Sequence, residues 1–246
     1  MKRTIEHIPA IEVVSDELKN EALPLVIYYH GWETSKELAL TPARKIAAKK
    51  IRVILPDAMY HGERRVKKKS MIPSFAFWSS IQHNLIEFDT IIDYYLKRDL
   101  ILDDRIGVAG FSMGGMTTSG LLTKHPEIKV ASILMGTPSY QGFIDRLLLA
   151  KRKYHVNVPD DLEDILFWTT RYDLNTQPET LAGRPLYFWH GTDDIKIPYS
   201  SSHDFYKQYK DTPSGRGMVY ETGENKPHIL TPDIMEHTAE FFSSHL

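Results

Sequence analysis

Short runs of β-branched and aromatic residues recur along the chain, and longer segments with a helical spacing of apolar positions separate them. The runs do not alternate between apolar and polar residues, which is typical of strands buried on both faces of a parallel sheet. Their alternation with helices predicts an α/β fold, in which crossover helices cover a mostly parallel sheet. Strands are predicted over residues 25–29, 51–55, 105–109, 130–134, 186–189 and 217–221, and helices over 38–50, 79–97, 113–125, 201–210 and 231–244.

The last helix has a clear start signal. Thr231 is a favoured N-cap residue, Pro232 suits the first helical position, and Asp233 adds an acid to the first turn. We therefore expect the chain to end on a helix that begins after Thr231.

The segment 139–184 departs from this regular alternation. It holds amphipathic stretches at 143–154 and 162–172, where one crossover helix would suffice. We interpret the segment as a small helical cap over the site; the alternative is an enlarged crossover that packs aside without touching substrate. A length of 246 residues fits one α/β domain with such an insertion, so we expect a single domain over 1–246.

Composition and charge narrow the classes of function. A formal net charge of −2 gives no argument for nucleic-acid binding, and the short basic run 64–69 is typical of a solvated loop. The absence of cysteine excludes disulfides, thiolate zinc sites and a cysteine nucleophile. The apolar runs are too short to span a bilayer, and the first residues lack the pattern of a secretory signal. We expect a soluble, cytoplasmic protein, and homo-oligomerisation stays open.

One pentapeptide predicts a nucleophile. Gly110-Phe111-Ser112-Met113-Gly114 lies between a predicted strand and a predicted helix, the context in which a Gly-x-Ser-x-Gly motif is informative. The glycines are needed because neighbouring backbone crowds the sharp turn. Ser112 then lies at a helix N-terminus, which favours a developing oxyanion, and the N–H of Met113 points the same way. The alternative is a glycine-rich turn that serves only packing.

A second oxyanion donor is expected after an earlier strand. His30-Gly31-Trp32 directly follows the strand at 25–29, so the N–H of Trp32 is the natural candidate. We interpret His30 as a structural hydrogen-bonding residue rather than the catalytic base.

The chain order of this architecture is serine, acid, histidine. After the strand at 186–189, Asp193 and Asp194 are adjacent carboxylates, and spacing alone does not separate them. Only some of the 11 histidines follow this acid, and of those only His228 lies in a loop after the last predicted strand. His228 is therefore the predicted base. The alternative is a surface histidine without a role.

Longer motifs extend the pattern. The chain resembles α/β-hydrolase esterases of the dienelactone-hydrolase-like and prolyl-oligopeptidase-like group. This resemblance implies that Asp194, four residues after His190, is the triad acid and that Trp32 and Met113 form the oxyanion hole. It also implies that the stretch with Asp57, His61 and Arg64 lines or braces the site entrance; we interpret these three residues as a hydrogen-bonded supporting group, and the alternative is a direct part in catalysis. The segments that carry the resemblance are 29–32, 56–64, 105–115 and 190–198.

Two departures restrict what the resemblance implies. Dienelactone hydrolases proper use a cysteine, which this chain lacks, and 246 residues leave no room for the propeller domain of the oligopeptidases. A compact carboxylesterase for small acyl esters remains, with no cofactor and no metal. The alternatives are a peptidase or amidase and a non-catalytic ligand-binding protein. Candidates for an apolar acyl pocket are Trp32, Tyr60, Phe75, Phe77, Trp78, Tyr140, Phe143, Phe167, Trp168 and Tyr172.

Overall fold

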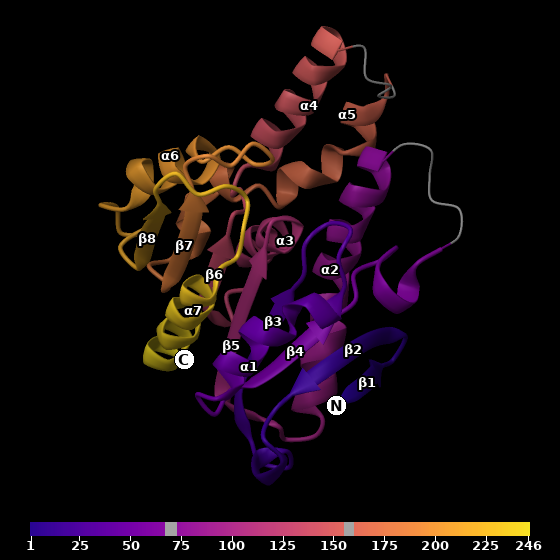
Figure 1. Ribbon diagram of the computed structural model, residues 1–246, viewed down its shortest axis with the longest axis vertical. Coiled ribbons are helices and arrows are strands. Elements are labelled where there is room, and N and C mark those ends of the chain that lie inside the picture. Colours follow the sequence, from indigo (N-terminus) through magenta and orange to yellow (C-terminus); the bar gives the residue numbers. More distant parts are fainter. Residues whose placement is uncertain (67–72, 155–159) are drawn as a thin grey trace.

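The computed structural model describes residues 1–66, 73–154 and 160–246 (Figure 1). Within them, an 8-stranded sheet has the order β1-β2-β4-β3-β5-β6-β7-β8. The basic run lies outside the described residues from position 67 to 69. The strands are β1 (Lys2–Ile5), β2 (Ile8–Val13), β3 (Leu23–Tyr29), β4 (Arg52–Pro56), β5 (Ile101–Phe111), β6 (Ile128–Leu134), β7 (Leu186–Gly191) and β8 (Met218–Gly223).

The helices lie between successive parallel strands, except for α7, which follows the last strand. They are α1 (Leu40–Ala47), α2 (Pro73–Leu96), α3 (Met113–Leu122), α4 (Tyr140–Tyr154), α5 (Leu162–Ile165), α6 (Ser200–Tyr209) and α7 (Pro232–His245).

The α/β fold class predicted from the sequence is confirmed. β3 to β8 pair in parallel, and each predicted strand is present. The hairpin of β1 and β2 was not predicted; β2 pairs antiparallel with β4 and forms an edge of mixed direction. Helix α7 begins after Thr231 as expected, although the Thr231 side chain makes no capping hydrogen bond.

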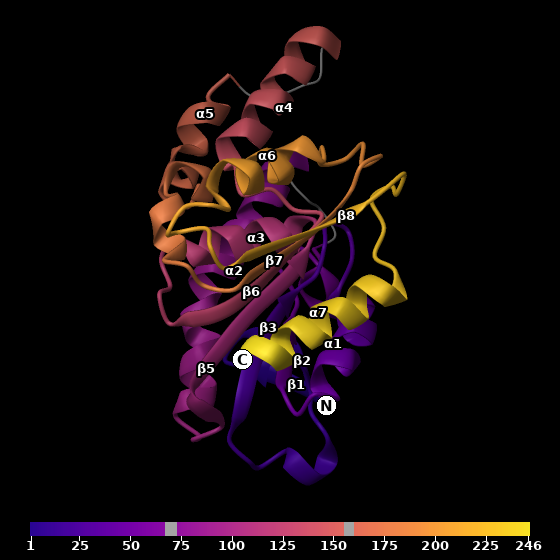
Figure 2. The ribbon, with the colours of Figure 1, turned by 90° about the vertical axis from the view of Figure 1, so that its left-hand side faces the viewer.

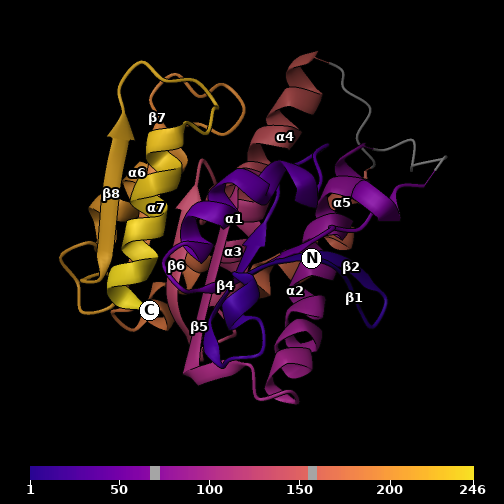
Figure 3. The ribbon, with the colours of Figure 1, turned by 60° about the horizontal axis from the view of Figure 1, so that its bottom comes forward.

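Two hydrophobic cores lie on opposite faces of the sheet. Figure 2 shows the sheet nearly edge-on, with α2, α3 and α6 on one side and α1 and α7 on the other. One core includes Phe88 of α2 and Phe205 of α6, and the other includes Ala43 of α1 and Phe242 of α7. Figure 3 shows α1 and α7 side by side on their shared face, where they contact each other.

All parallel strands end at the same edge of the sheet. The loops after β3, β5, β7 and β8 therefore meet there, and these loops carry the predicted site residues. Helices α4 and α5 lie beyond this edge (Figure 1).

Candidate active site

Ser112 occupies a strained turn between β5 and α3. Its backbone has φ 57° and ψ −119°, an unusual conformation for a residue with a side chain. A Cβ on Gly110 would lie 2.3 Å from the carbonyl carbon of Gly114, and a Cβ on Gly114 would lie 2.1 Å from the oxygen of Tyr29. The two glycines therefore permit a crossing of backbones that side chains would block, as expected for a nucleophile turn.

The loops after β7 and β8 bring a carboxylate and an imidazole together. His228 Nδ1 lies 2.6 Å from Asp194 Oδ2, and both side chains are largely buried. This bond leaves Nε2 as the nitrogen available to a serine. Among the described residues no hydrogen bond joins Ser112 to His228; such bonds are often long before substrate binds.

The two adjacent aspartates have different surroundings. Asp194 is 7% exposed and accepts the N–H groups of Lys196 and Ile197 at 2.9 and 3.0 Å. Asp193 is exposed, and its own N–H donates to the carbonyl of Lys226 at 3.0 Å. Of the two aspartates that spacing left open, Asp194 is the one whose carboxylate bonds His228.

The surroundings of Asp194 keep it ionised. Burial by itself raises the pKa of this carboxyl, but the hydrogen bonds from His190, His228 and the N–H of Ile197 outweigh it and hold the pKa well below its ordinary value. Asp194 is thus a carboxylate throughout the pH range of an ordinary assay. His190 was not singled out by the sequence as a partner of this acid.

His30 is bonded through both ring nitrogens. Nδ1 lies 2.8 Å from the carbonyl oxygen of Gly31, so it donates, and Nε2 accepts the N–H of Ala58 at 3.0 Å. Burial lowers the pKa of His30, which favours the neutral form. These contacts tie the loop after β3 to the loop after β4, which agrees with the structural role expected for His30.

His61 holds the loop that carries Trp32. Its Nδ1 donates to the carbonyl of Met59 at 2.8 Å, and its Nε2 accepts the N–H of Glu33 at 3.0 Å. The ring also packs edge-on against Trp32, with centroids 4.8 Å apart. Met113, the other expected oxyanion donor, opens α3, where the first amide groups lack partners within the helix.

Asp57 is the centre of a buried ion pair that the sequence did not reveal. Its carboxylate accepts the N–H and the Nζ of Lys36, at 3.1 and 2.5 Å, and the N–H of Glu63 at 2.9 Å. Gly62 follows His61 with φ +50°, and a Cβ there would lie 2.0 Å from Asp57 Oδ1. This contact explains why glycine stands at position 62.

Arg64 does not pair with the Asp57 carboxylate. Its guanidinium donates to the carbonyl oxygen of Asp57 at 3.1 Å and forms two bonds of 2.7 Å with Glu87 of α2. Arg64 is thus joined to Asp57 through a backbone carbonyl only. The side-chain partners are Lys36 for Asp57 and Glu87 for Arg64.

Removing one member of the buried pair should destabilise the fold. Burial by itself lowers the pKa of Lys36, but its bonds to Asp57 and Glu63 raise it above the ordinary value. Replacing Lys36 by methionine leaves the Asp57 charge buried and unpaired, which costs about 3 to 5 kcal/mol of the free energy of unfolding. Urea unfolding measures this loss. Lys45→Met, which breaks the half-exposed pair with Glu236, is the control and should cost about 1 kcal/mol or less. Equal losses in the two variants would contradict the assignment.

The aromatic residues separate into different environments. Trp78 and Tyr140 are core residues, 1% and 0% exposed. Phe77 of α2 instead joins Trp32 to Phe143 of α4, with ring centroids 5.5 and 5.7 Å away. This row of three rings leads from the oxyanion loop to the helical segment after β6.

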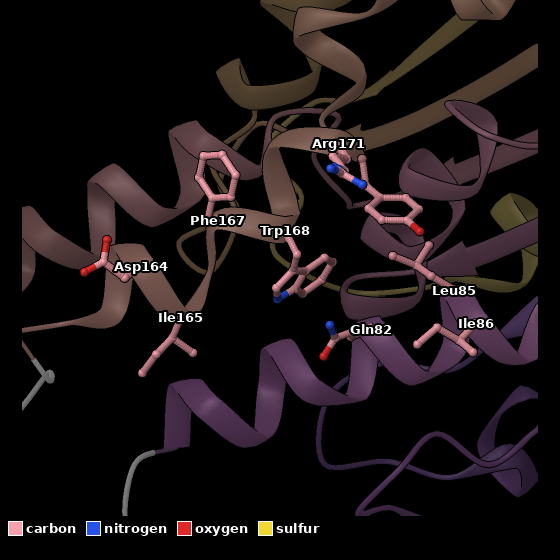
Figure 4. Close-up of a pocket in the computed structure, with 9 residues that line it drawn as sticks. Gln82, Leu85, Ile86, Asp164, Ile165, Phe167, Trp168 and Arg171 are labelled. Atoms are coloured by element: carbon pink, nitrogen blue, oxygen red, sulfur yellow. The ribbon is translucent and has the colours of Figure 1, made fainter.

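A separate cavity of about 430 Å³ lies between α2 and the segment after α5 (Figure 4). Trp168 is central in its lining, with Phe167 and Gln82 on either side and Arg171 toward one end. None of the predicted catalytic or oxyanion residues lines this cavity. Phe167, Trp168 and Tyr172, which the sequence suggested for the acyl pocket, thus line a cavity that includes none of those residues.

In the described part of the chain, the group of acidic and histidine side chains close enough to share an ion is Asp89, His125 and Glu127, with ligand atoms within 4.8 Å of one another. His125 already bonds Glu127 at 2.7 Å. In the same residues, no helix combines the length and the apolar character needed to cross a membrane.

A mostly parallel sheet with a strained serine turn after β5 and a histidine after β8 is the α/β-hydrolase fold. The solved structure of TT1662 from Thermus thermophilus superposes with a TM-score of 0.76 at 18% identity, over 99% of this chain and 96% of that one. The profile of the prolyl oligopeptidase family matches residues 82–246, and the chain belongs to that family.

Two curated proteins are similar over nearly their whole length. "Putative esterase YitV" of Bacillus subtilis (strain 168) is 33% identical over 99% of this chain and 98% of its own. "Esterase YjfP" of Escherichia coli (strain K12) is 27% identical over the same shares of the two chains. The family expected from the sequence motifs is thus confirmed.

Proposed function

We propose that this protein is a serine hydrolase that cleaves carboxylic esters through an acyl-serine intermediate. The observation that carries the proposal is the 2.6 Å contact of Asp194 with His228, at the same sheet edge as the strained turn of Ser112. The esterase names of the two full-length relatives support the choice of ester substrates.

The reaction would use these groups in order. His228 Nε2 takes the Ser112 proton as the hydroxyl attacks the ester carbonyl, and the N–H groups of Trp32 and Met113 bind the oxyanion. His228 then gives the proton to the departing alkoxide, and an acyl-serine remains. Water, deprotonated by His228, releases the acid and restores Ser112. Asp194 fixes the tautomer of His228 and stabilises the imidazolium.

A peptidase or amidase is the second candidate, because the chain belongs to the prolyl oligopeptidase family. The direct test compares p-nitrophenyl acetate and butyrate with an aminoacyl p-nitroanilide under the same conditions. We expect turnover of the esters and far slower turnover of the anilide. Faster anilide cleavage would favour the peptidase, and turnover of neither would favour a ligand-binding protein.

We place the acyl group beside the row of Trp32, Phe77 and Phe143. Trp32 carries one proposed oxyanion donor, so the acyl carbon lies near its backbone, and the row of rings limits the space beyond it. Phe143 comes from α4, so the segment 139–184 would act as a cap with a direct part in substrate choice. The single domain over 1–246, the cytoplasmic location and the absence of nucleic-acid and membrane partners stay predictions.

Removing the Phe143 ring should lengthen the acyl chain that the enzyme accepts. In Phe143→Ala, the ratio of kcat/KM for p-nitrophenyl octanoate to that for the acetate should rise about tenfold, since each methylene placed in an apolar pocket changes binding by this order. Phe167→Ala is the control, because Phe167 is 67% exposed and, among the described residues, its ring contacts none of the three rings of this row. A chain-length profile that changes equally in both variants would contradict the placement.

A further inference from the structure

A buried chain of hydrogen bonds continues from Asp194 into the space between β7 and α6. The Nε2 atom of His190 lies 3.1 Å from Asp194 Oδ2 and 2.9 Å from the carbonyl oxygen of Ile197. Its Nδ1 atom lies 2.8 Å from Ser202 Oγ, which lies 2.9 Å from the Tyr220 hydroxyl. His190 and Ser202 are 0% and 1% exposed, so bulk water does not compete for these bonds.

The donor and the acceptor of each of these hydrogen bonds follow from the atoms around His190 Nε2. The carboxylate and the carbonyl on that side only accept, so Nε2 carries the proton. In a neutral imidazole, Nδ1 then accepts from the Ser202 hydroxyl, whose oxygen accepts from Tyr220. Burial raises the pKa of Tyr220, which keeps its hydroxyl protonated and able to donate. Every donor in the chain therefore points toward Asp194.

We infer that His190 is a positioning residue of the active site, held in its Nε2–H tautomer by Ser202 and Tyr220 so that it orients Asp194 toward His228. The inference rests on the proposed function, because it assigns His190 to the support of the triad. It adds three supporting residues to the triad, His190, Ser202 and Tyr220, which reach it through Asp194.

The geometry of the carboxylate shows why this bond matters. Asp194 Oδ1 accepts the N–H groups of Lys196 and Ile197, while Oδ2 accepts both histidines. With fixed donors on both oxygens, the carboxylate plane does not rotate. Loss of the His190 donor frees Oδ2 and leaves more negative charge facing His228. The protonated form of His228 is then favoured, and activity is lost at a higher pH.

Other ionisable groups lie around these hydrogen bonds, and the test variants replace only Tyr220 and Tyr199 among them. They come from the acid loop, from the loop before α7, from α6 and its N-terminus, and from β8. They are Asp194, Lys196, His228, Tyr199, His203, Asp204, Tyr206, Tyr220 and Glu221.

The test is the pH profile of kcat/KM for p-nitrophenyl acetate in variants of His190. In His190→Phe we expect a loss of about ten- to a hundredfold, the usual effect of removing a hydrogen bond to a charged group, and an acid limb at higher pH. His190→Gln places an amide N–H near the position of Nε2. It should restore most of kcat/KM and most of the wild-type position of the acid limb. Ser202→Ala and Tyr220→Phe should shift the limb in the same direction with smaller losses.

Tyr199→Phe is the matched control, because the Tyr199 hydroxyl bonds Thr222 at 2.9 Å and is no part of the chain. Its acid limb should coincide with that of the wild type. If His190→Phe does not fold, Ser202→Ala and Tyr220→Phe decide the question. Equal losses in His190→Gln and His190→Phe, or acid limbs unchanged in all chain variants, would overturn the inference. Failure of wild-type turnover to depend on Ser112 would instead overturn the proposed function.

Discussion

Ser112→Ala is expected to lower kcat for p-nitrophenyl acetate by about 10⁴- to 10⁶-fold, the range found when single members of a catalytic triad are removed. The loss is large because the hydroxyl forms the covalent intermediate, and no other group in the site replaces it. The residual activity should come from direct attack of water on the bound ester, which the oxyanion hole still stabilises.

The control for this variant is Ser201→Ala, which removes a hydroxyl of α6 that has no part in the proposed reaction. Its kcat should match the wild type. Alanine also fits the turn at 112 no worse than serine, since both carry a Cβ at the same strained φ. Comparable Tm values for the two variants would show that a lost rate is lost chemistry. If Ser112→Ala turns over the ester at the wild-type rate, the assignment of the nucleophile is wrong.

Asp194→Asn is expected to lower kcat by about 10⁴-fold while Asp193→Asn leaves it nearly unchanged. The amide keeps the size of the side chain but removes the charge that stabilises the His228 imidazolium, and it also favours the wrong tautomer of His228. Asp193 is exposed, and among the described residues its side chain bonds only its neighbour Thr192. Of the two variants, only Asp194→Asn changes the contact with His228.

Steady-state kinetics of both variants between pH 6 and 9 measure the difference. The pKa of Asp194 is held below its ordinary value, so the wild-type enzyme has the carboxylate ionised across that whole range. Titration of Asp194 therefore adds no pH dependence to the ratio of the wild-type kcat to that of Asp194→Asn. Equal losses in the two variants, or a larger one in Asp193→Asn, would show that the contact with His228 does not carry the function.

The sequence predicted the parallel part of the sheet because its strands are continuous apolar runs. The hairpin of β1 and β2 has no such run, since Glu12 interrupts it. In the folded chain Glu12 is 1% exposed and pairs with Arg52 of β4, so a charge that argues against a buried strand is neutralised by a partner 40 residues away. Such a pairing is visible only when the strands are placed side by side.

The same limit applies to the site. Ser112 and His228 could be predicted from chain order, because the fold places a nucleophile and a base after particular strands. Asp193 and Asp194 differ by one position, and only the direction of each side chain separates them. Lys36 and Glu87 carry no motif of their own, so the charged network around Asp57 emerges only from the packing of the loop after β4 on its neighbours.

Aromatic residues near the predicted loops gave the least specific information. Trp78 and Tyr140 became core, while Phe77 and Phe143 faced each other across the space between α2 and α4. Each pair takes one aromatic ring from α2 and one from α4, so the sequence alone did not distinguish a fully buried ring from a partly buried one.

The central claim is that Ser112 is a nucleophile activated within the folded site, and a fluorophosphonate labels such a serine covalently. Peptide mapping by mass spectrometry after reaction of the native enzyme should find one adduct, on Ser112, and none in Ser112→Ala or in wild-type protein reacted in urea. An adduct on another residue, or no adduct on folded wild-type enzyme, would contradict the proposed mechanism.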